Sequence, residues 1–259
     1  MRKTVLIFLV LPGYVACAQL TTDTVSFDTS YTLKEKKSPA ILRAGLALGY
    51  IGATYYCYRK EDNHFQNESQ EHKHPLKDAV ARNLSPLGTA QTNWMALGAT
   101  TGFAYLTRNT RLQHVVFVWA GSLLINDALT NKLKNSFQRY RPSTGKPFNS
   151  FDGNEGPGAN RSFPSAHTSN AFTTATVFAT LYKDKHWVPP LAYGLATMVG
   201  FSRVYDNAHW ASDVMAGAAV GFLSAKTMIL TDKWVGKKNI RLYPQVSKRS
   251  ASMGMVKTF

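Results

Sequence analysis

Residues 200–213 read GFSRVYDNAHWASD and carry three side chains suited to phosphate chemistry: Arg203, His209 and Asp213. Positions four apart share one face of a helix, so Asp213 can hold one ring nitrogen of His209 and leave the other nitrogen free to attack. The guanidinium of Arg203 is planar and permanently charged, which suits it to phosphate oxygens. The stretch therefore predicts a nucleophile, its orienting acid and an anion clamp. The ordinary alternative is a helix start with a solvated salt bridge.

A second segment, residues 134–142, reads KNSFQRYRP and supplies two further cations. Lys134 and Arg141 are seven positions apart, about two helical turns, so both can project to one side of a helix that ends at Pro142. A basic helix end of this kind is common on protein surfaces. The segment becomes informative only together with its neighbours in the chain.

A third segment, residues 162–168, reads SFPSAHT and precedes a long apolar run. A loop of small residues entering a helix presents free backbone N–H groups, which form an anion site. Ser165 adds a hydroxyl donor, and His167 could protonate a leaving oxygen. Alone, His167 would be an ordinary histidine at a helix N-terminus.

Together the three segments resemble the signature of the type 2 phosphatidic acid phosphatase superfamily, which also contains class A acid phosphatases and vanadium haloperoxidases. That signature is Lys, six residues, Arg-Pro; then Pro-Ser-Gly-His; then Ser-Arg, five residues, His, three residues, Asp. The corresponding residues here follow in the same order and spacing over roughly residues 90–232: Lys134, Arg141-Pro142, Pro164-Ser165-Ala166-His167, Ser202-Arg203, His209 and Asp213. One position departs, because Ala166 stands where the family usually has Gly. Alanine keeps the N–H donor and restricts φ.

The resemblance implies an all-α fold: a single-domain bundle of about six helices with the active site at one end. It also implies hydrolysis of a phosphate monoester without a metal or cofactor. His209 would attack phosphorus and become a phosphohistidine, Asp213 would orient it, and His167 would protonate the leaving alcohol and then help to activate water. The implied phosphate-binding residues are Lys134, Arg141, Ser165, Ala166 through its N–H, and Arg203.

Two other classes of function remain open. A haloperoxidase would use the same residues to hold vanadate with His209 as its ligand, although this chain is short for one. A phosphate- or phospholipid-binding module without catalysis would need neither His167 nor His209 with Asp213. A metal site at His64, His72 and His74 fits no firm ligand spacing, so we expect residues 59–77 to form a solvated loop.

The N-terminus, MRKTVLIFLVLPGYVACAQL, predicts a secretory signal over residues 1–18 with cleavage after Ala18. Cleavage would leave Cys57 as the remaining cysteine, which excludes an intramolecular disulfide. We expect a polar extension over 19–38, a helical phosphatase domain over 39–232 and a basic tail over 233–259. The tail contains strand-like pieces such as IRLYPQV.

Helices are expected over the ranges 40–58, 78–83, 93–107, 113–137, 167–182, 189–203 and 210–231. Gly217 and Gly221 are spaced for close contact between helices. Residues 143–162 are rich in Gly, Pro, Ser and Asn, which predicts a loop at the rim of the pocket.

The formal net charge of +15 favours anionic substrates or an anionic membrane surface, and no recognition helix or stacking motif indicates nucleic-acid binding. Helices of 15 to 20 residues are short for membrane spans. With a cleaved signal, spans at 40–58, 93–107 and 113–131 would also leave Lys134 and Arg141 in the cytoplasm. We therefore expect an exported periplasmic protein, soluble or membrane-associated, while an integral membrane form stays open. The apolar helices favour an envelope lipid phosphate as substrate over a small soluble phosphomonoester.

Overall fold

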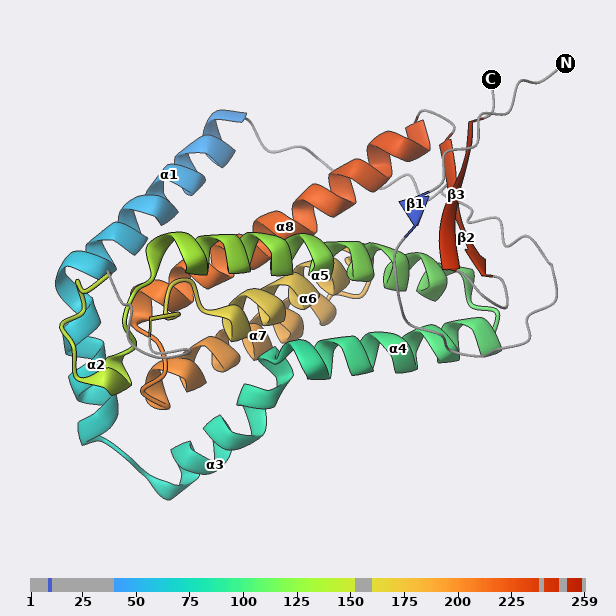
Figure 1. The fold of residues 1–259 in the computed structure, drawn as a ribbon. Coiled ribbons are helices and arrows are strands. Elements are labelled where there is room, and N and C mark those ends of the chain that lie inside the picture. The colour runs from blue at the N-terminus through green and yellow to red at the C-terminus, as the bar shows by residue number, and fades with distance from the viewer. Residues whose placement is uncertain (1–8, 11–39, 152–159, 238–239, 247–250, 258–259) are drawn as a thin grey trace, which may run out of the picture.

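The computed structural model describes residues 9–10, 40–151, 160–237, 240–246 and 251–257, and these contain eight α-helices (Figure 1). Six of these helices have 16 residues or more: α1 (Ala40–Tyr56), α4 (Ala90–Leu106), α5 (Thr110–Phe137), α6 (Ala166–Leu181), α7 (Val188–Tyr205) and α8 (Ala211–Lys237). The predicted all-α class, with about six main helices, is confirmed.

A short helix and the start of a second one occupy residues 59–77, which were expected to be a loop, and the second contains the helix predicted over 78–83. A π-helical turn, η1 (Cys57–Glu61), continues α1 into α2 (Asp62–Glu71), and α3 spans Pro75–Leu84. The loop prediction was wrong because most of the charged residues lie on exposed helix faces, while Asp62 and Gln66 are buried. The break between the helices ends where Nδ1 of His74 accepts the Leu76 N–H and Pro75 starts the next turn.

Helix α6 forms the centre of the bundle and packs against α5, α7 and α8 (Figure 1). Its sequence is dominated by Ala, Ser and Thr, which lets neighbouring backbones come close. A Cβ on Gly221 would lie 2.2 Å from the Ser169 carbonyl oxygen, and one on Gly217 would lie 2.5 Å from the Ser165 oxygen. The close contact predicted for these two glycines is confirmed. The main apolar core lies beside it, formed by Leu97, Val115, Val116, Val118, Trp119, Leu123, Val177, Ala225 and Ile229.

Two helix ends differ from the sequence prediction. Helix α5 ends at Phe137, because Gln138 adopts a left-handed conformation (φ 45°) and caps the helix through the Lys134 carbonyl. Arg141 therefore lies outside that helix, in extended backbone. Helix α7 ends at Tyr205 and Asn207 also has positive φ (57°), so His209 lies in the turn before α8. The sequence predicts that Lys134 and Arg141 project from one helix, and that His209 and Asp213 do. Both predictions were wrong.

The described parts of the two termini form a small sheet of strand order β1-β3-β2. Strand β1 (Leu9–Val10) pairs with β3 (Ala251–Lys257), and β2 (Ile240–Val246) pairs with β3 in antiparallel register from Ile240↔Lys257 to Val246↔Ala251. The strand prediction for IRLYPQV is confirmed. The rest of the predicted signal and the polar extension lie outside the described residues, as does 152–159 of the predicted loop.

Candidate active site

The N-terminus of α6 supplies backbone donors at one end of the bundle. Ser165 is the N-cap: its hydroxyl oxygen accepts from Thr168 N and from Thr168 Oγ1, and its carbonyl accepts from Ser169 N. The first N–H groups of a helix have no acceptor within it and carry the positive end of the helix dipole. The N–H groups of Ala166 and His167 hold this position, so the helix start is suited to an anion.

His209 lies in the turn between α7 and α8. The Arg203 carbonyl accepts hydrogen bonds from Ala208 N (3.1 Å) and His209 N (3.2 Å), which fixes the turn. The His209 side chain is 2% exposed, and its Nδ1 lies 3.8 Å from Oδ2 of Asp213. This separation suits an ion pair and exceeds a hydrogen bond.

Ser162 lies between these two side chains and was missed by the sequence analysis. Its Oγ is 2.5 Å from Oδ2 of Asp213 and 3.4 Å from Nδ1 of His209. Because the single hydroxyl hydrogen points to the carboxylate, the serine oxygen faces Nδ1 as an acceptor. Nδ1 therefore carries the ring hydrogen, and Nε2 keeps the lone pair that a nucleophile needs. Ser162 opens the SFPSAHT segment, and nothing else in the sequence distinguishes it.

Behind Asp213 lies a buried arginine that the sequence analysis also missed. Arg139 is 1% exposed and donates to Oδ1 of Asp213 (2.6 Å), to Oδ2 of Asp62 (2.7 Å) and to Oγ of Ser212 (2.8 Å). Asp62, on α2, also accepts from N and Oγ of Ser212. Burial raises the pKa of the Asp62 carboxyl, while Arg139 and the two Ser212 donors act in the opposite direction.

Three further cations reach the same end of the bundle from different elements. Lys134, near the end of α5, donates to the Arg161 carbonyl (2.6 Å), and Nη1 of Arg141 donates to the Ala208 carbonyl (3.3 Å). Nη1 of Arg203 contacts Ser85 Oγ (2.6 Å) and Asp206 Oδ2 (2.9 Å). Within the described part of the chain, Nε of Arg203 is a buried nitrogen without a hydrogen-bond partner. Such a nitrogen can donate to a bound anion.

Both imidazoles respond to these cations. Burial lowers the pKa of His167 to about 4, and the charges of Arg203, Arg141 and Lys134 contribute. Burial also lowers the pKa of His209 to about 3; Asp213 opposes this shift, and Lys134 and Arg141 add to it. Both rings are therefore neutral at pH 7, in a positive environment suited to an anion.

All eight predicted site residues lie at one end of the bundle, the end next to α2 (Figure 1). The α6 start provides Ser165, Ala166 and His167, and the ends of the other long helices and their adjoining turns provide Lys134, Arg141, Arg203, His209 and Asp213. The eight residues gather at one end of the bundle, while their function as a site and the chemical role of each stay predictions. In the described residues no three His, Cys, Asp or Glu side chains gather as metal ligands; His64 instead pairs with Glu68.

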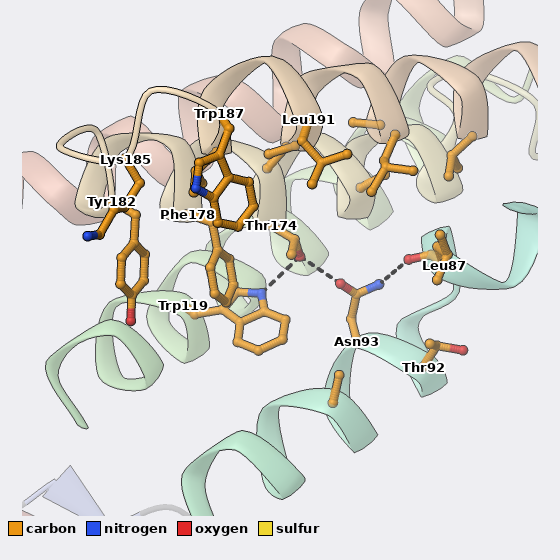
Figure 2. A pocket seen from close by; sticks show the side chains of 18 residues that line it. Leu87, Thr92, Asn93, Trp119, Thr174, Phe178, Tyr182, Lys185, Trp187 and Leu191 are labelled. Carbon is orange, nitrogen blue, oxygen red and sulfur yellow. Dashed lines mark hydrogen bonds between the residues drawn. The ribbon is translucent and has the colours of Figure 1, made fainter. Parts of the chain in front are cut away.

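An apolar groove of about 800 Å³ begins beside this end and runs along α4, α6 and α7 (Figure 2). Its polar wall atoms satisfy one another: Trp119 Nε1 donates to Thr174 Oγ1, Thr174 Oγ1 to Asn93 Oδ1, and Asn93 Nδ2 to the Leu87 carbonyl. Leu87 belongs to η2 (Ser85–Gly88), and a Cβ on Gly88 would lie 2.6 Å from the His167 oxygen. One end of the groove is therefore adjacent to the candidate site, and the other reaches Tyr182 and Lys185.

The sequence and the fold match a known family. A family model described as the PAP2 superfamily matches residues 115–237. The lipid A 1-phosphatase of Rhizobium etli is 30% identical over 164 residues, which are 56% of this chain and 68% of that protein. This chain belongs to the PAP2 superfamily, which confirms the resemblance found in the sequence.

Two further comparisons agree. The lipid A 1-phosphatase of Porphyromonas gingivalis is 38% identical over 138 residues, which are 50% of this chain and only 26% of that longer relative. The crystal structure of LpxE from Aquifex aeolicus has a similar fold, with a TM-score of 0.54 and 24% identity over 65% of this chain and 94% of that one.

Proposed function

We propose that this protein is a phosphatase that hydrolyses the phosphate monoester of a lipid through a phosphohistidine on His209. The observation that carries the proposal is the convergence of three cations and two neutral imidazoles on the N-terminus of α6. A tetrahedral dianion fits this arrangement because it offers several oxygens to positive groups and one face to the nucleophile.

The reaction has two steps. Lys134, Arg141, Arg203, the Ser165 hydroxyl and the Ala166 N–H bind the phosphate oxygens. Nε2 of His209 forms a bond to phosphorus, the bond from phosphorus to the alcohol oxygen breaks, and His167 gives that oxygen its proton. Water then attacks phosphorus and passes a proton to His167, the phosphorus–nitrogen bond breaks, and phosphate leaves. The fixed cations supply the charge stabilisation that a metal provides in other phosphatases.

The groove supports a lipid as the alcohol. Its walls are apolar, and it begins beside His167, where the leaving group must lie. Between Ala171 and Phe178 it follows α6 for about 10 Å, at 1.5 Å per residue, which suits an extended acyl chain. Two relatives are named lipid A 1-phosphatases, which agrees with a lipid substrate.

The outer surface supports membrane association. Large apolar side chains are exposed on several helices, among them Met95, Phe103 and Leu106 on α4, Leu191 and Phe201 on α7, and Leu223 and Leu230 on α8. Exposed large apolar side chains in this number favour contact with lipid or protein. Two segments of the described chain, Thr110–Thr144 and Ala211–Gly236, are long and apolar enough to cross a membrane by length and composition. We propose an exported, membrane-associated enzyme whose helical domain extends from about residue 39 to the end of α8.

The test compares phosphate release from long-chain phosphatidate in mixed micelles with release from glucose 6-phosphate, both in EDTA. We expect a higher kcat/KM for the lipid and no effect of EDTA. We also expect a loss of at least ~10³-fold in His209→Ala, because the nucleophile is removed. Preference for the sugar phosphate would indicate a general acid phosphatase, and halide oxidation with vanadate and peroxide would indicate a haloperoxidase. Loss of activity in EDTA that returns with zinc would contradict the mechanism.

A further inference from the structure

Two carboxylates from distant parts of the chain share one buried guanidinium behind the candidate nucleophile. Asp62 on α2 is 1% exposed, Asp213 on α8 is 0% exposed, and Arg139 between them is 1% exposed. Both ion pairs are short, 2.7 Å to Asp62 and 2.6 Å to Asp213. Asp62 lies outside residues 115–237, the part that matches the family model.

The surroundings keep water away from these charges. The guanidinium carbon of Arg139 lies 5.2 Å from the ring centre of Tyr58 and 5.5 Å from those of Phe151 and Trp210. Nε of Arg139 donates to the Phe148 carbonyl (2.9 Å). In such a poorly solvated place charge interactions are strong, so the sum of the charges beside His209 matters.

The net charge of these three groups determines how strongly they stabilise a cationic His209 ring. Asp213 and Arg139 alone would form a neutral pair, with charges of −1 and +1. Asp62 adds a second −1, so the buried trio carries a net charge of −1 when all three are ionised. Asp213 of this trio lies beside His209, and Ser162 bridges the two side chains. A ring that becomes cationic on bonding phosphorus is stabilised by a net negative neighbour and gains little from a neutral one.

We infer that Asp62 is a positioning residue for the proposed reaction: it acts through Arg139, whose charge it offsets, so that Asp213 leaves net negative charge for His209. This inference rests on the proposed function. It assigns a role to α2, an element that supplies none of the predicted site residues.

The first test replaces Asp62 by a neutral residue and by another acid. Asp62→Asn keeps the shape and removes the charge, so kcat should fall by about 100-fold while KM stays within about twofold, because the phosphate-binding cations are untouched. Asp62→Glu should recover at least about tenfold of that loss, because it restores the charge. His64→Ala, an exposed position on the same helix, is the matched control and should resemble wild type. An Asp62→Asn protein that folds and keeps wild-type kcat overturns the inference.

A double substitution separates charge from structure. D62N/R139Q removes one negative and one positive charge and leaves Asp213 as the net −1 beside His209. Its kcat should exceed that of D62N by about tenfold or more, whereas a structural role for the two residues predicts an equal or larger loss. Where D62N fails to fold, the double variant is compared with wild type. A kcat within about tenfold then supports the inference, and a loss of about 100-fold or more overturns it.

A binding measurement tests the inference even if the wild-type protein hydrolyses none of the substrates. Orthovanadate accepts a bond from the nucleophilic nitrogen and makes the ring cationic, whereas inorganic phosphate binds through the cations alone. By calorimetry, D62N should lose about tenfold or more in vanadate affinity and little in phosphate affinity. Equal changes for both anions would contradict the inference. An inactive wild-type protein that shows the expected split would refute only the proposed function.

Discussion

His167 illustrates how strongly one side chain in this site depends on its neighbours. Burial and the charges of Arg203, Arg141 and Lys134 lower its pKa to about 4, so the ring is neutral in the ligand-free protein at pH 7. A bound phosphate dianion offsets those positive charges and therefore raises the pKa of His167. In the proposed reaction, the substrate itself would thus load the proton that the leaving alcohol needs.

A titration tests this coupling. In protein with 13C-labelled histidine, the His167 resonance should titrate near pH 4 without ligand and at least about one pH unit higher with saturating inorganic phosphate. The pH profile of kcat reports the enzyme–substrate complex, and that of kcat/KM reports the free enzyme. The alkaline limb of the kcat profile should therefore lie at higher pH than the alkaline limb of the kcat/KM profile. A ligand-free midpoint near the ordinary histidine value of about 6.5, unmoved by phosphate, would contradict the account.

At this scale the sequence identifies the residues whose spacing is fixed along the chain. His167, His209 and Asp213 could be predicted because they stand in short motifs. Ser162, Arg139 and Asp62 could not, because only the fold creates the contacts that bring them beside Asp213. Asp62 and Ser212, which form two hydrogen bonds, are 150 positions apart.

At the scale of helices, the contact between α6 and α8 places the acid Asp213 beside the anion-binding helix start. The Ser165 N–H donates to the Asp213 carbonyl, and Gly217 and Gly221 allow the two backbones to touch. The sequence predicts this contact from its glycine spacing. The sequence wrongly places Lys134 with Arg141, and His209 with Asp213, on shared helices. Left-handed residues after α5 and α7 end those helices before Arg141 and His209. Such helix ends depend on tertiary contacts more than on propensity.

Gly221→Ala should therefore destabilise the protein and reduce its activity. The added Cβ would lie 2.2 Å from the Ser169 oxygen and 2.9 Å from Thr173 N, so α8 must move away from α6. We expect a loss of about 1–3 kcal/mol in the free energy of unfolding, measured by denaturation in the same buffer as the assay. Gly98→Ala on α4, where a Cβ meets nothing within 4 Å, is the control and should be neutral or slightly stabilising. Equal effects at both positions would refute the close-contact argument.

For the whole molecule, the main contrast is between a positive site at one end and an apolar groove and surface along the bundle. The sequence predicts an all-α bundle and an anionic substrate from its motifs and charge. The groove was not predictable, because its lining comes from five elements, η2, α4, α5, α6 and α7. The helical periodicity of their apolar residues also fits an ordinary core. Helix α2 and the first turn of α3 were missed because their charged faces resemble a solvated loop, whereas the rest of α3 agrees with the helix predicted over 78–83.

Blocking the groove should change the choice of substrate. Ala96 on α4 is exposed within the groove, and Ala96→Trp should raise KM for long-chain phosphatidate by about tenfold by displacing several buried methylenes. KM for p-nitrophenyl phosphate, which has no chain, should stay within about twofold. Gly98→Trp, about 200° away around the same helix, is the matched control. An equal rise for both substrates in Ala96→Trp would show that the groove does not hold the chain.

His209 can be tested as the nucleophile by trapping the phosphorylated protein. His167→Ala removes the proposed base that accepts a proton from the attacking water, while p-nitrophenyl phosphate needs no proton for its leaving group, so the intermediate should accumulate. After an alkaline quench, which preserves phosphohistidine, peptide mass spectrometry should locate close to one phosphate per protein on His209. The double variant His167→Ala/His209→Ala should carry none. Phosphate on another residue, or nitrophenol released by the double variant at the rate of the single one, would contradict His209 as the nucleophile.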